Sequence, residues 1–305
     1  MFSRGFSLSN LELFNIPRPQ LMVGLYVVGV INGLTAGVYQ AFHRQGLVEA
    51  ALNLFDVNVV VLFAAAVGFG LAWRSCDRIT RGTDLVVAAL FAAMITIPDS
   101  RVSWIALSLL ALYNMMCGRR CTYTVAAASV LAALSFHEVW ARMIKNIFTV
   151  PLTHFDATLV GLALALAQQE VSRNGNLITT GNDFTLMVLQ GCASFGNASL
   201  ALLCWVAITR SIRPRWKPSE WFTVLTIIVC VVGLNVMRMV LMAMGGPIYE
   251  AVHRTSGGTF FNLLILAVSM LINLIGVRHE IWANCSGSHS RPASSWKCCD
   301  QDQSA

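Results

Sequence analysis

The sequence predicts an all-α fold, a polytopic transmembrane helical bundle with about eight or nine membrane helices. Hydrophobic residues make up 56% of the 305 residues and charged residues only 12%, whereas soluble domains carry about 25% charged residues. Several apolar stretches approach the roughly 20 residues that a helix needs to cross a bilayer. Long apolar runs such as 227–234 do not alternate as the strands of a membrane β-barrel would. A helical bundle is therefore the architecture that we expect.

The expected membrane elements follow one another from residue 21 onward. The apolar stretches lie near 21–41, 55–73, 84–97, 102–116, 122–140, 155–171, 184–208, 221–245 and 259–277. We divide the chain into an N-terminal segment 1–20, a membrane domain 21–277 and a tail 278–305. The tail is rich in Ser and contains Gly and Pro, so we expect it to be disordered.

The first apolar stretch begins after twenty residues and is not followed by a small-x-small cleavage site. We expect it to remain as a helix and not to be removed as a secretion signal. Within it, Gly29, Gly33 and Gly37 recur at four-residue intervals, which suits close packing against another helix.

The stretches 84–97 and 102–116 are short, and the polar residues 98–101 interrupt them. Nine full spans would place the two chain ends on opposite sides of the membrane. They would also bring the basic loops at 74–81 and 119–120 into conflict with a cytoplasmic 209–220 loop. We therefore expect a re-entrant or tilted pair of helices over 84–116.

The net charge of +6 resides largely in short loops between apolar stretches. That pattern is typical of membrane orientation and argues against nucleic-acid binding. No metal or organic cofactor is expected. Cys298-Cys299 lacks the spacing of a structural zinc site, and neither His137-Glu138 nor the run from His154 to Asp156 has the spacing that places two imidazoles on one helix face.

The expected orientation of the helices places Cys192, Arg238 and His253 at a similar depth in the membrane. The 209–220 loop carries four basic residues and one acidic residue, so it should be cytoplasmic. Cys192 then lies about 24 Å away, near the outer face, and Arg238 lies some 25 Å up the next helix. His253 follows in the outer connection. All three residues are expected on the external side of the membrane.

A thiol, a guanidinium and an imidazole at one depth indicate covalent catalysis. Cysteine is a strong nucleophile once ionised, a cation favours its thiolate, and an imidazole can transfer the proton that acyl transfer needs. Asn235 is three residues before Arg238, and its amide can orient the guanidinium. Taken singly, each residue also has an ordinary interpretation: a buried thiol, an arginine reaching the outer headgroups, and a loop histidine. Their agreement in depth favours the joint interpretation.

The order of these features resembles the exosortase/archaeosortase family of multi-spanning prokaryotic membrane transpeptidases. The resemblance covers 136–277 and rests on several features in fixed order: Trp140, Pro151-Leu152, Gly175, Gly181, Gly-Cys-Ala-Ser at 191–194, a basic loop, Asn235-x-x-Arg238, His253 and a Gly-Gly pair. It implies that Cys192 is the nucleophile and that Arg238 and His253 are its catalytic partners. One departure is clear: the family has Ser-Gly after its cysteine, and this chain has Ala193-Ser194.

The resemblance also implies a substrate and a place. Members of the family act on secreted proteins whose C-terminus carries a short motif, a transmembrane helix and a basic tail. They cleave near the motif at the outer face of the cytoplasmic membrane and pass the acyl group to a lipid or a surface polymer. A link to exopolysaccharide production follows. The activity would be that of a cysteine protease and transpeptidase, with membrane lipid as a further partner.

A different class remains open. A transporter, or an assembly component of a polysaccharide-export system, would also be apolar and multi-spanning. Transporters show repeated halves and polar residues at the membrane midplane. This chain has no visible internal repeat, and its polar cluster is expected at one face, so we favour the enzyme.

Overall fold

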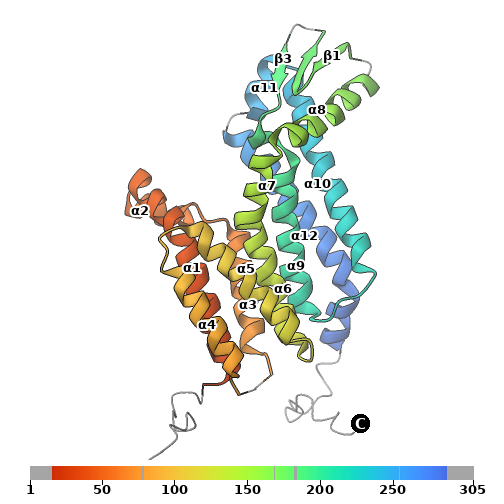
Figure 1. Ribbon diagram of the computed structural model, residues 1–305. Coiled ribbons are helices and arrows are strands. Elements are labelled where there is room, and N and C mark those ends of the chain that lie inside the picture. Colours follow the sequence, from red (N-terminus) through yellow and green to blue (C-terminus); the bar gives the residue numbers. More distant parts are fainter. Residues whose placement is uncertain (1–15, 77–78, 168, 182–183, 254, 287–305) are drawn as a thin grey trace, which may run out of the picture. The chain divides into compact units, whose positions relative to one another are not determined.

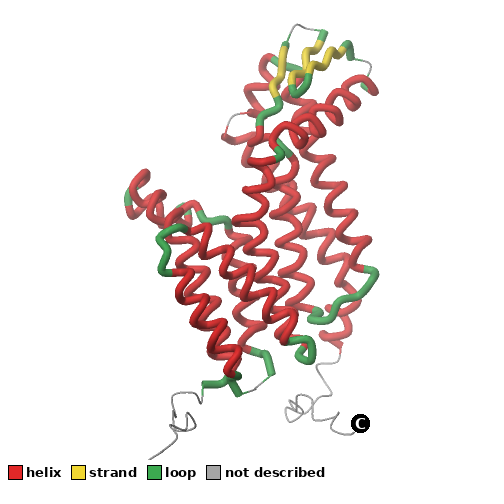
Figure 2. The backbone as a smooth tube through the Cα atoms, viewed as in Figure 1, coloured by secondary structure: helices red, strands yellow, loops and turns green. Residues whose placement is uncertain are grey.

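The computed structural model describes residues 16–76, 79–167, 169–181, 184–253 and 255–286. It is mostly helical and divides into two compact units, Met1–Val57 with Ala65–Leu131, and Asn58–Ala64 with Ala132–Ala305 (Figure 1). Within the described residues, six helices are long and apolar enough to cross a membrane, and two more apolar helices are shorter. The prediction of a polytopic helical membrane protein is confirmed, although a small β-sheet, drawn yellow in Figure 2, was not expected.

The first unit is built from helices joined by short loops. Its elements are α1 (Arg18–Gln45), α2 (Leu47–Leu52), the short 3₁₀ helix η3 (Leu54–Asp56), α3 (Val59–Trp73), α4 (Gly82–Ile95), α5 (Ser100–Cys117) and α6 (Thr122–Ser135), with the ends of α3 and α6 belonging to the second unit. Helix α1 packs on α4 and α5. A Cβ atom at Gly33 would lie 2.6 Å from the Trp104 ring, and the Trp104 Nε1–H donates to the Gly33 carbonyl at 3.1 Å. The glycine stripe predicted from the sequence serves close packing at Gly29 and Gly33, whereas Gly37 faces open space.

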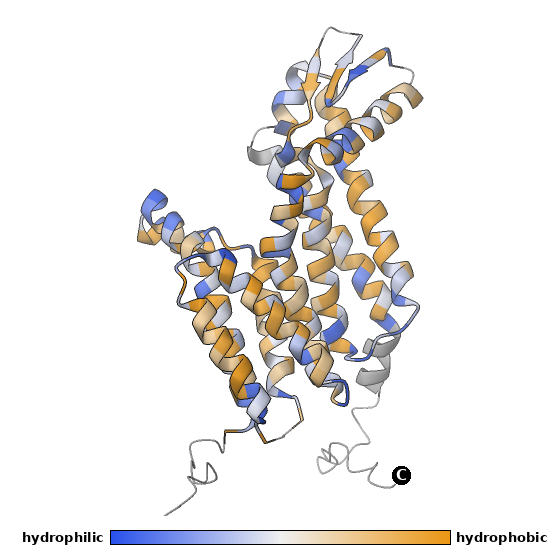
Figure 3. Cartoon of the chain, in the orientation of Figure 1, coloured by the Kyte–Doolittle hydropathy of each residue, from blue (hydrophilic) through white to orange (hydrophobic). Residues whose placement is uncertain are grey.

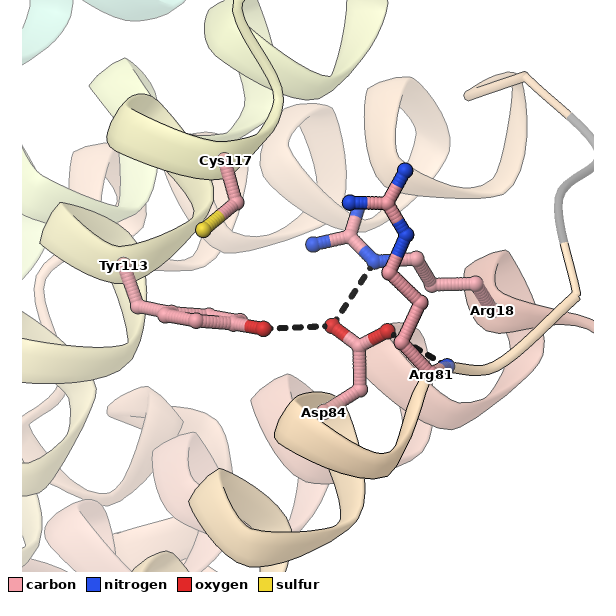
Figure 4. A pocket seen from close by; sticks show the side chains of 5 residues that line it. All are labelled: Arg18, Arg81, Asp84, Tyr113 and Cys117. Atoms are coloured by element: carbon pink, nitrogen blue, oxygen red, sulfur yellow. Dashed lines mark hydrogen bonds and ion pairs between the residues drawn. The ribbon is translucent and has the colours of Figure 1, made fainter.

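Polar side chains close one end of this unit (Figure 4). Asp84 is fully buried, and its carboxylate accepts hydrogen bonds from Arg18 Nε at 2.9 Å and from the Tyr113 hydroxyl at 2.8 Å. Arg18 also donates to Asn114 at 2.9 Å. The space beside them, about 10 Å³, holds roughly one water molecule. A buried carboxylate that is paired in this way joins α1, α4 and α5.

A disulfide between Cys76 and Cys121 links the loops before α4 and before α6. Neither cysteine was singled out from the sequence, because no spacing pattern marks a pair that is 45 residues apart.

The second unit contains a helix bundle with a small sheet at one end. Its elements are the end of α6, the π-helical turn η4 (Phe136–Trp140), α7 (Ala141–Ile147), α8 (Thr149–Leu166), β1 (Val171–Asn174), β2 (Leu177–Thr180), β3 (Thr185–Met187), the 3₁₀ turn η5 (Gln190–Cys192), α9 (Ser194–Ile212), α10 (Glu220–Ala243), α11 (Gly246–His253) and α12 (Thr255–Ser286). Helices α9, α10 and α12 pack on one another. Figure 3 shows α10 as apolar along most of its length. Several of its large apolar side chains, including Leu225 and Val229, are exposed, as lipid-facing residues would be.

The connected helices α6 to α7 run antiparallel to α9. The amide of Gln190 donates to Asn146 at 2.8 Å, and the His137 ring lies 2.9 Å from the Ser199 hydroxyl. Residues near 146 are therefore level with the start of α9.

Helix α8 does not run back along α9. Asp156 in its first half bonds to Ser194 at the start of α9, while Val160 and Leu164 pack with Met239 and Met242 near the end of α10. Both halves of α8 therefore lie at the same end of the second unit. The stretch over 84–116, where a re-entrant or tilted pair is expected, forms the helices α4 and α5, which pack on one another.

The stretch from 184 to 192 was predicted as part of a helix, and that prediction is wrong. These residues form β3 and η5, and α9 begins only at Ser194. Phe184, Leu186 and Val188 pack inward while Thr185 and Met187 are exposed. That period-two alternation is typical of a strand, and the apolar run concealed it.

A cluster of nine buried apolar residues supports this end of the unit, and we name it the end cluster. Its members are Ala157, Val160, Leu164, Ile178, Leu186, Val188, Met239, Met242 and Ala243. They come from α8, the sheet and α10, so the cluster ties these elements together. At the other end of the chain, α12 continues to Ser286, beyond the predicted boundary at 277, and the remainder of the predicted disordered tail lies outside the described residues.

Candidate active site

Cys192 lies in the turn between β3 and α9. It is the last residue of η5, and Ala193 is the N-cap residue of α9. The side chain is half-buried and packs against the end cluster. Its backbone N–H donates to the Leu189 carbonyl at 2.9 Å, which closes the turn.

Asn235 holds this turn from α10. Its side chain is 1% exposed, and its amide donates to the Cys192 carbonyl at 2.8 Å and to the Ser194 hydroxyl at 3.0 Å. The sequence predicted a supporting role for Asn235 toward Arg238. The contacts that it makes are with the cysteine turn.

Asp156 completes the network from α8. This carboxylate is 2% exposed and accepts the Ser194 backbone N–H at 2.8 Å and the Ser194 hydroxyl at 2.6 Å. Hydrogen bonds to a charged group are short and strong, and a buried carboxylate without them would be costly. From the sequence, Asp156 was considered only as a potential metal ligand, in a run without the spacing of a metal site. Two sequence features could have indicated this contact. Asp156 is an acidic residue within a largely apolar run, and Ser194 is a serine two residues after the cysteine.

Arg238 follows Asn235 by one helical turn and is half-buried. Its Nε atom is buried and has no hydrogen-bond partner among the described residues. Its Nη2 atom would lie 3.4 Å from a Cβ atom placed on Gly258, so the guanidinium reaches the start of α12.

His253 is the exposed last residue of α11. Its ring stacks on Tyr249 with 5.0 Å between ring centroids and 12° between planes. Tyr249 in turn contacts Phe184 at 5.4 Å and packs against the end cluster, as Cys192 does. Elements that carry the thiol and the imidazole therefore meet at one cluster.

The structure brings the predicted residues together to different degrees. Cys192 and Asn235 are in direct contact, Arg238 lies one turn further along α10, and His253 is connected through Tyr249. Within the described residues, the thiol, the guanidinium and the imidazole form no hydrogen bond with one another.

The backbone donors around the thiol are already used. The N–H groups of Cys192, Ala193 and Ser194 bond to Leu189, Gln190 and Asp156 respectively. These three N–H groups are therefore not free to receive a developing oxyanion. The half-buried guanidinium of Arg238 is a side-chain donor on the adjoining helix α10.

A family model described as transmembrane exosortase matches residues 53–275. The chain belongs to the transmembrane exosortase family. Exosortases are membrane transpeptidases that process C-terminal sorting signals. The match extends the resemblance seen over 136–277 toward the N-terminus. No curated protein and no solved structure matches the chain.

One of the two residues noted above as departing from the expected Ser-Gly pair makes contacts in this site of the exosortase. Ser194, in place of the family's glycine, supplies the hydroxyl that joins Asp156 to Asn235. The departure is thus accommodated within the network that surrounds Cys192.

Other polar clusters of the exosortase have structural partners. Glu138 pairs with Arg142 at 2.7 Å, and no group of three potential metal ligands occurs among the described residues. Arg210 is completely buried, pairs with Glu220 and lies 4.0 Å from the Trp216 ring centroid. These contacts fix the basic loop between α9 and α10.

Proposed function

We propose that this exosortase is a cysteine transpeptidase in which Cys192 is the nucleophile, Arg238 stabilises the oxyanion and His253 transfers protons. The observation that carries the proposal is the buried chain of hydrogen bonds from Asp156 through Ser194 and Asn235 to the Cys192 carbonyl. A nucleophile must be held in a defined position to react efficiently. These hydrogen bonds connect α8, α9 and α10, and the last of them is to the backbone carbonyl of Cys192.

The reaction proceeds in two halves. The Cys192 thiolate attacks the carbonyl carbon of the scissile peptide bond, and the resulting oxyanion is stabilised by Arg238. The C–N bond then breaks while His253 protonates the departing amine, which leaves a thioester on Cys192. In the second half, His253 takes a proton from the acceptor nucleophile, which attacks the thioester and releases the thiolate.

The assignment of Arg238 to the oxyanion follows from the use of the local backbone donors. Because the three backbone N–H groups at 192–194 are all engaged, we assign the new negative charge to the guanidinium, a cationic donor on the adjoining helix α10. Its half-buried position strengthens such an interaction.

The substrates in this proposal are secreted proteins with a C-terminal motif, a transmembrane helix and a basic tail. Cleavage takes place at the outer face of a prokaryotic cytoplasmic membrane. The acyl group passes to a lipid or a surface polymer, with a link to exopolysaccharide production. The family assignment supports the substrate class, and the basic 213–217 loop at the opposite end of α9 and α10 supports the orientation.

The test is replacement of the thiol. We expect Cys192→Ala to abolish processing and to cause a full-length precursor to accumulate, because loss of a covalent nucleophile removes the route of the reaction. The measurement is an immunoblot of candidate secreted proteins in cells that express each variant at equal membrane levels.

Cys204→Ala and Cys230→Ala are the matched controls, because Cys204 is 2% exposed and Cys230 lies within α10 as a packing residue. Both should process normally. Full processing by Cys192→Ala would overturn the proposal.

A further inference from the structure

The third strand of the sheet has an open edge. The strand order is β1-β2-β3, and both pairings are antiparallel, so β3 has a strand on one side only. Thr180 N–H donates to the Phe184 carbonyl and Val188 N–H to the Asn176 carbonyl. Hydrogen-bonded pairs alternate in an antiparallel ladder. The residues at 184, 186 and 188 therefore direct their backbone groups toward β2, and those at 185 and 187 direct theirs away from it.

The outward backbone groups of Thr185 and Met187 have no partner among the described residues. The segment is also unprotected by its sequence, since Thr185-Leu186-Met187 contains neither charge nor proline. Proteins normally blunt an exposed edge with such residues. The other edge strand shows the contrast: β1 contains Arg173, whose guanidinium donates to Thr158 of α8 at 2.9 Å.

This edge leads directly to the candidate nucleophile. Cys192 follows Met187 by five residues, and β3 runs toward the turn that carries it (Figure 1). Phe184, just before β3, contacts Tyr249, on which His253 stacks. The chain therefore passes from the contact with Tyr249 along β3 and reaches Cys192 five residues after the strand ends.

We infer that the open edge of β3 binds the extended segment of the substrate that precedes the scissile bond, as an added strand paired through Thr185 and Met187. This inference rests on the proposed function and specifies its substrate site. Strand addition supplies affinity from backbone hydrogen bonds and leaves side chains free to set specificity.

The direction of the added strand follows from the order of elements. In the exosortase, β3 is followed by the Cys192 turn and then by the apolar helix α9. In the substrate class, a short motif is followed by a transmembrane helix. Two chains that enter the membrane from the same side run in the same direction, so the substrate segment pairs parallel to β3.

Removal of one backbone donor tests this pairing. The probe is the precursor that accumulates in Cys192→Ala cells, and the measurement is its rate of processing. Met187→Pro removes the outward N–H, and its fixed backbone angle is compatible with an edge strand. We expect Met187→Pro to slow processing about tenfold, the effect of roughly one backbone hydrogen bond. Met187→Ala also shortens the side chain but keeps the N–H, so it should process several-fold faster than Met187→Pro.

A second measurement applies if Met187→Pro fails to reach the membrane. A photo-reactive amino acid placed at position 187 in the Cys192→Ala protein should capture the precursor, and one at Ser172 on β1 should not. Normal processing by Met187→Pro, or capture at Ser172 alone, would overturn the inference and leave the proposed function standing. Failure of the proposed function is distinct, because no precursor would accumulate in Cys192→Ala cells.

Discussion

At the scale of single residues, the structure adds a chain of hydrogen-bonded polar groups to the predicted thiol, guanidinium and imidazole. An ionised Asp156 carboxylate only accepts, so in that state the Ser194 hydroxyl donates to it and presents a lone pair to the Asn235 amide. The Asn235 amide then donates to the Cys192 carbonyl. This hydrogen bond holds the peptide group next to the thiol.

The sequence pointed to Cys192, Arg238, His253 and Asn235 from depth and family order. It did not identify Asp156, because a carboxylate in one apolar stretch and a serine in another become partners only when α8 packs on the start of α9. It also assigned Asn235 to the neighbouring guanidinium, since helical spacing reveals partners on the same helix and not those on another element.

The polar chain predicts how substitutions behave. Asp156→Asn and Ser194→Ala should each slow processing by roughly tenfold or more, because each breaks a buried charge-assisted hydrogen bond. The double variant should be no slower than Asp156→Asn alone, since residues of one network do not contribute independently. The measurement is the processing rate at equal amounts of folded protein.

Thr153→Ala is the control for that experiment. Thr153 in α8 is buried, at 4% exposed, as Asp156 is at 2%, but its hydroxyl bonds only to its own helix. It should process at nearly the wild-type rate. Multiplicative effects of Asp156→Asn and Ser194→Ala would show that the two residues do not act through a common chain.

At the scale of elements, the sequence predicted the polar loops and the apolar helices. It did not predict the structure of the 184–192 stretch or the placement of α8. The 184–192 stretch is apolar enough for a helix, yet its alternating burial makes it a strand and a turn. Helix α8 has the length and composition of a membrane span, but its packing keeps both halves at the same end of the unit. Hydropathy does not predict either outcome, because it averages over the faces of a segment and contains no information on which other elements the segment packs against.

The position of α8 predicts a labelling pattern. Single cysteines placed at Phe148 and Leu166, before and at the end of α8, should react alike with a membrane-impermeant thiol reagent in intact cells. A cysteine at Ser219, in the basic loop, should not react. The measurement is labelling before and after permeabilisation in a background without other cysteines. Opposite behaviour of positions 148 and 166 would mean that α8 crosses the membrane, and labelling at 219 would reverse the orientation.

At the scale of the whole molecule, the family match spans parts of both units, while the groups assigned to chemistry all lie in the second. If α8 does not cross, two crossings separate the loop at 118–121 from the loop at 213–219. The basic Arg119-Arg120 pair and the basic 213–217 segment then share one side, which resolves the conflict seen in the sequence. The Cys76–Cys121 disulfide favours the opposite assignment, with the loop at 118–121 on the external side, because disulfides persist in oxidising compartments. A cysteine at Thr122, just after that loop and partly exposed, added to the same labelling series, decides between the charge argument and the disulfide argument.

The central claim is that Cys192 forms a thioester with the substrate. The most direct measurement mixes wild-type exosortase in membrane vesicles with the precursor that accumulates in Cys192→Ala cells, stops the reaction with acid and determines the mass of the enzyme. The account predicts an adduct of the amino-terminal part of the precursor on Cys192, which hydroxylamine removes and which Cys192→Ala cannot form. Continued processing with no adduct on Cys192, or an adduct that survives the Cys192→Ala substitution, would contradict it.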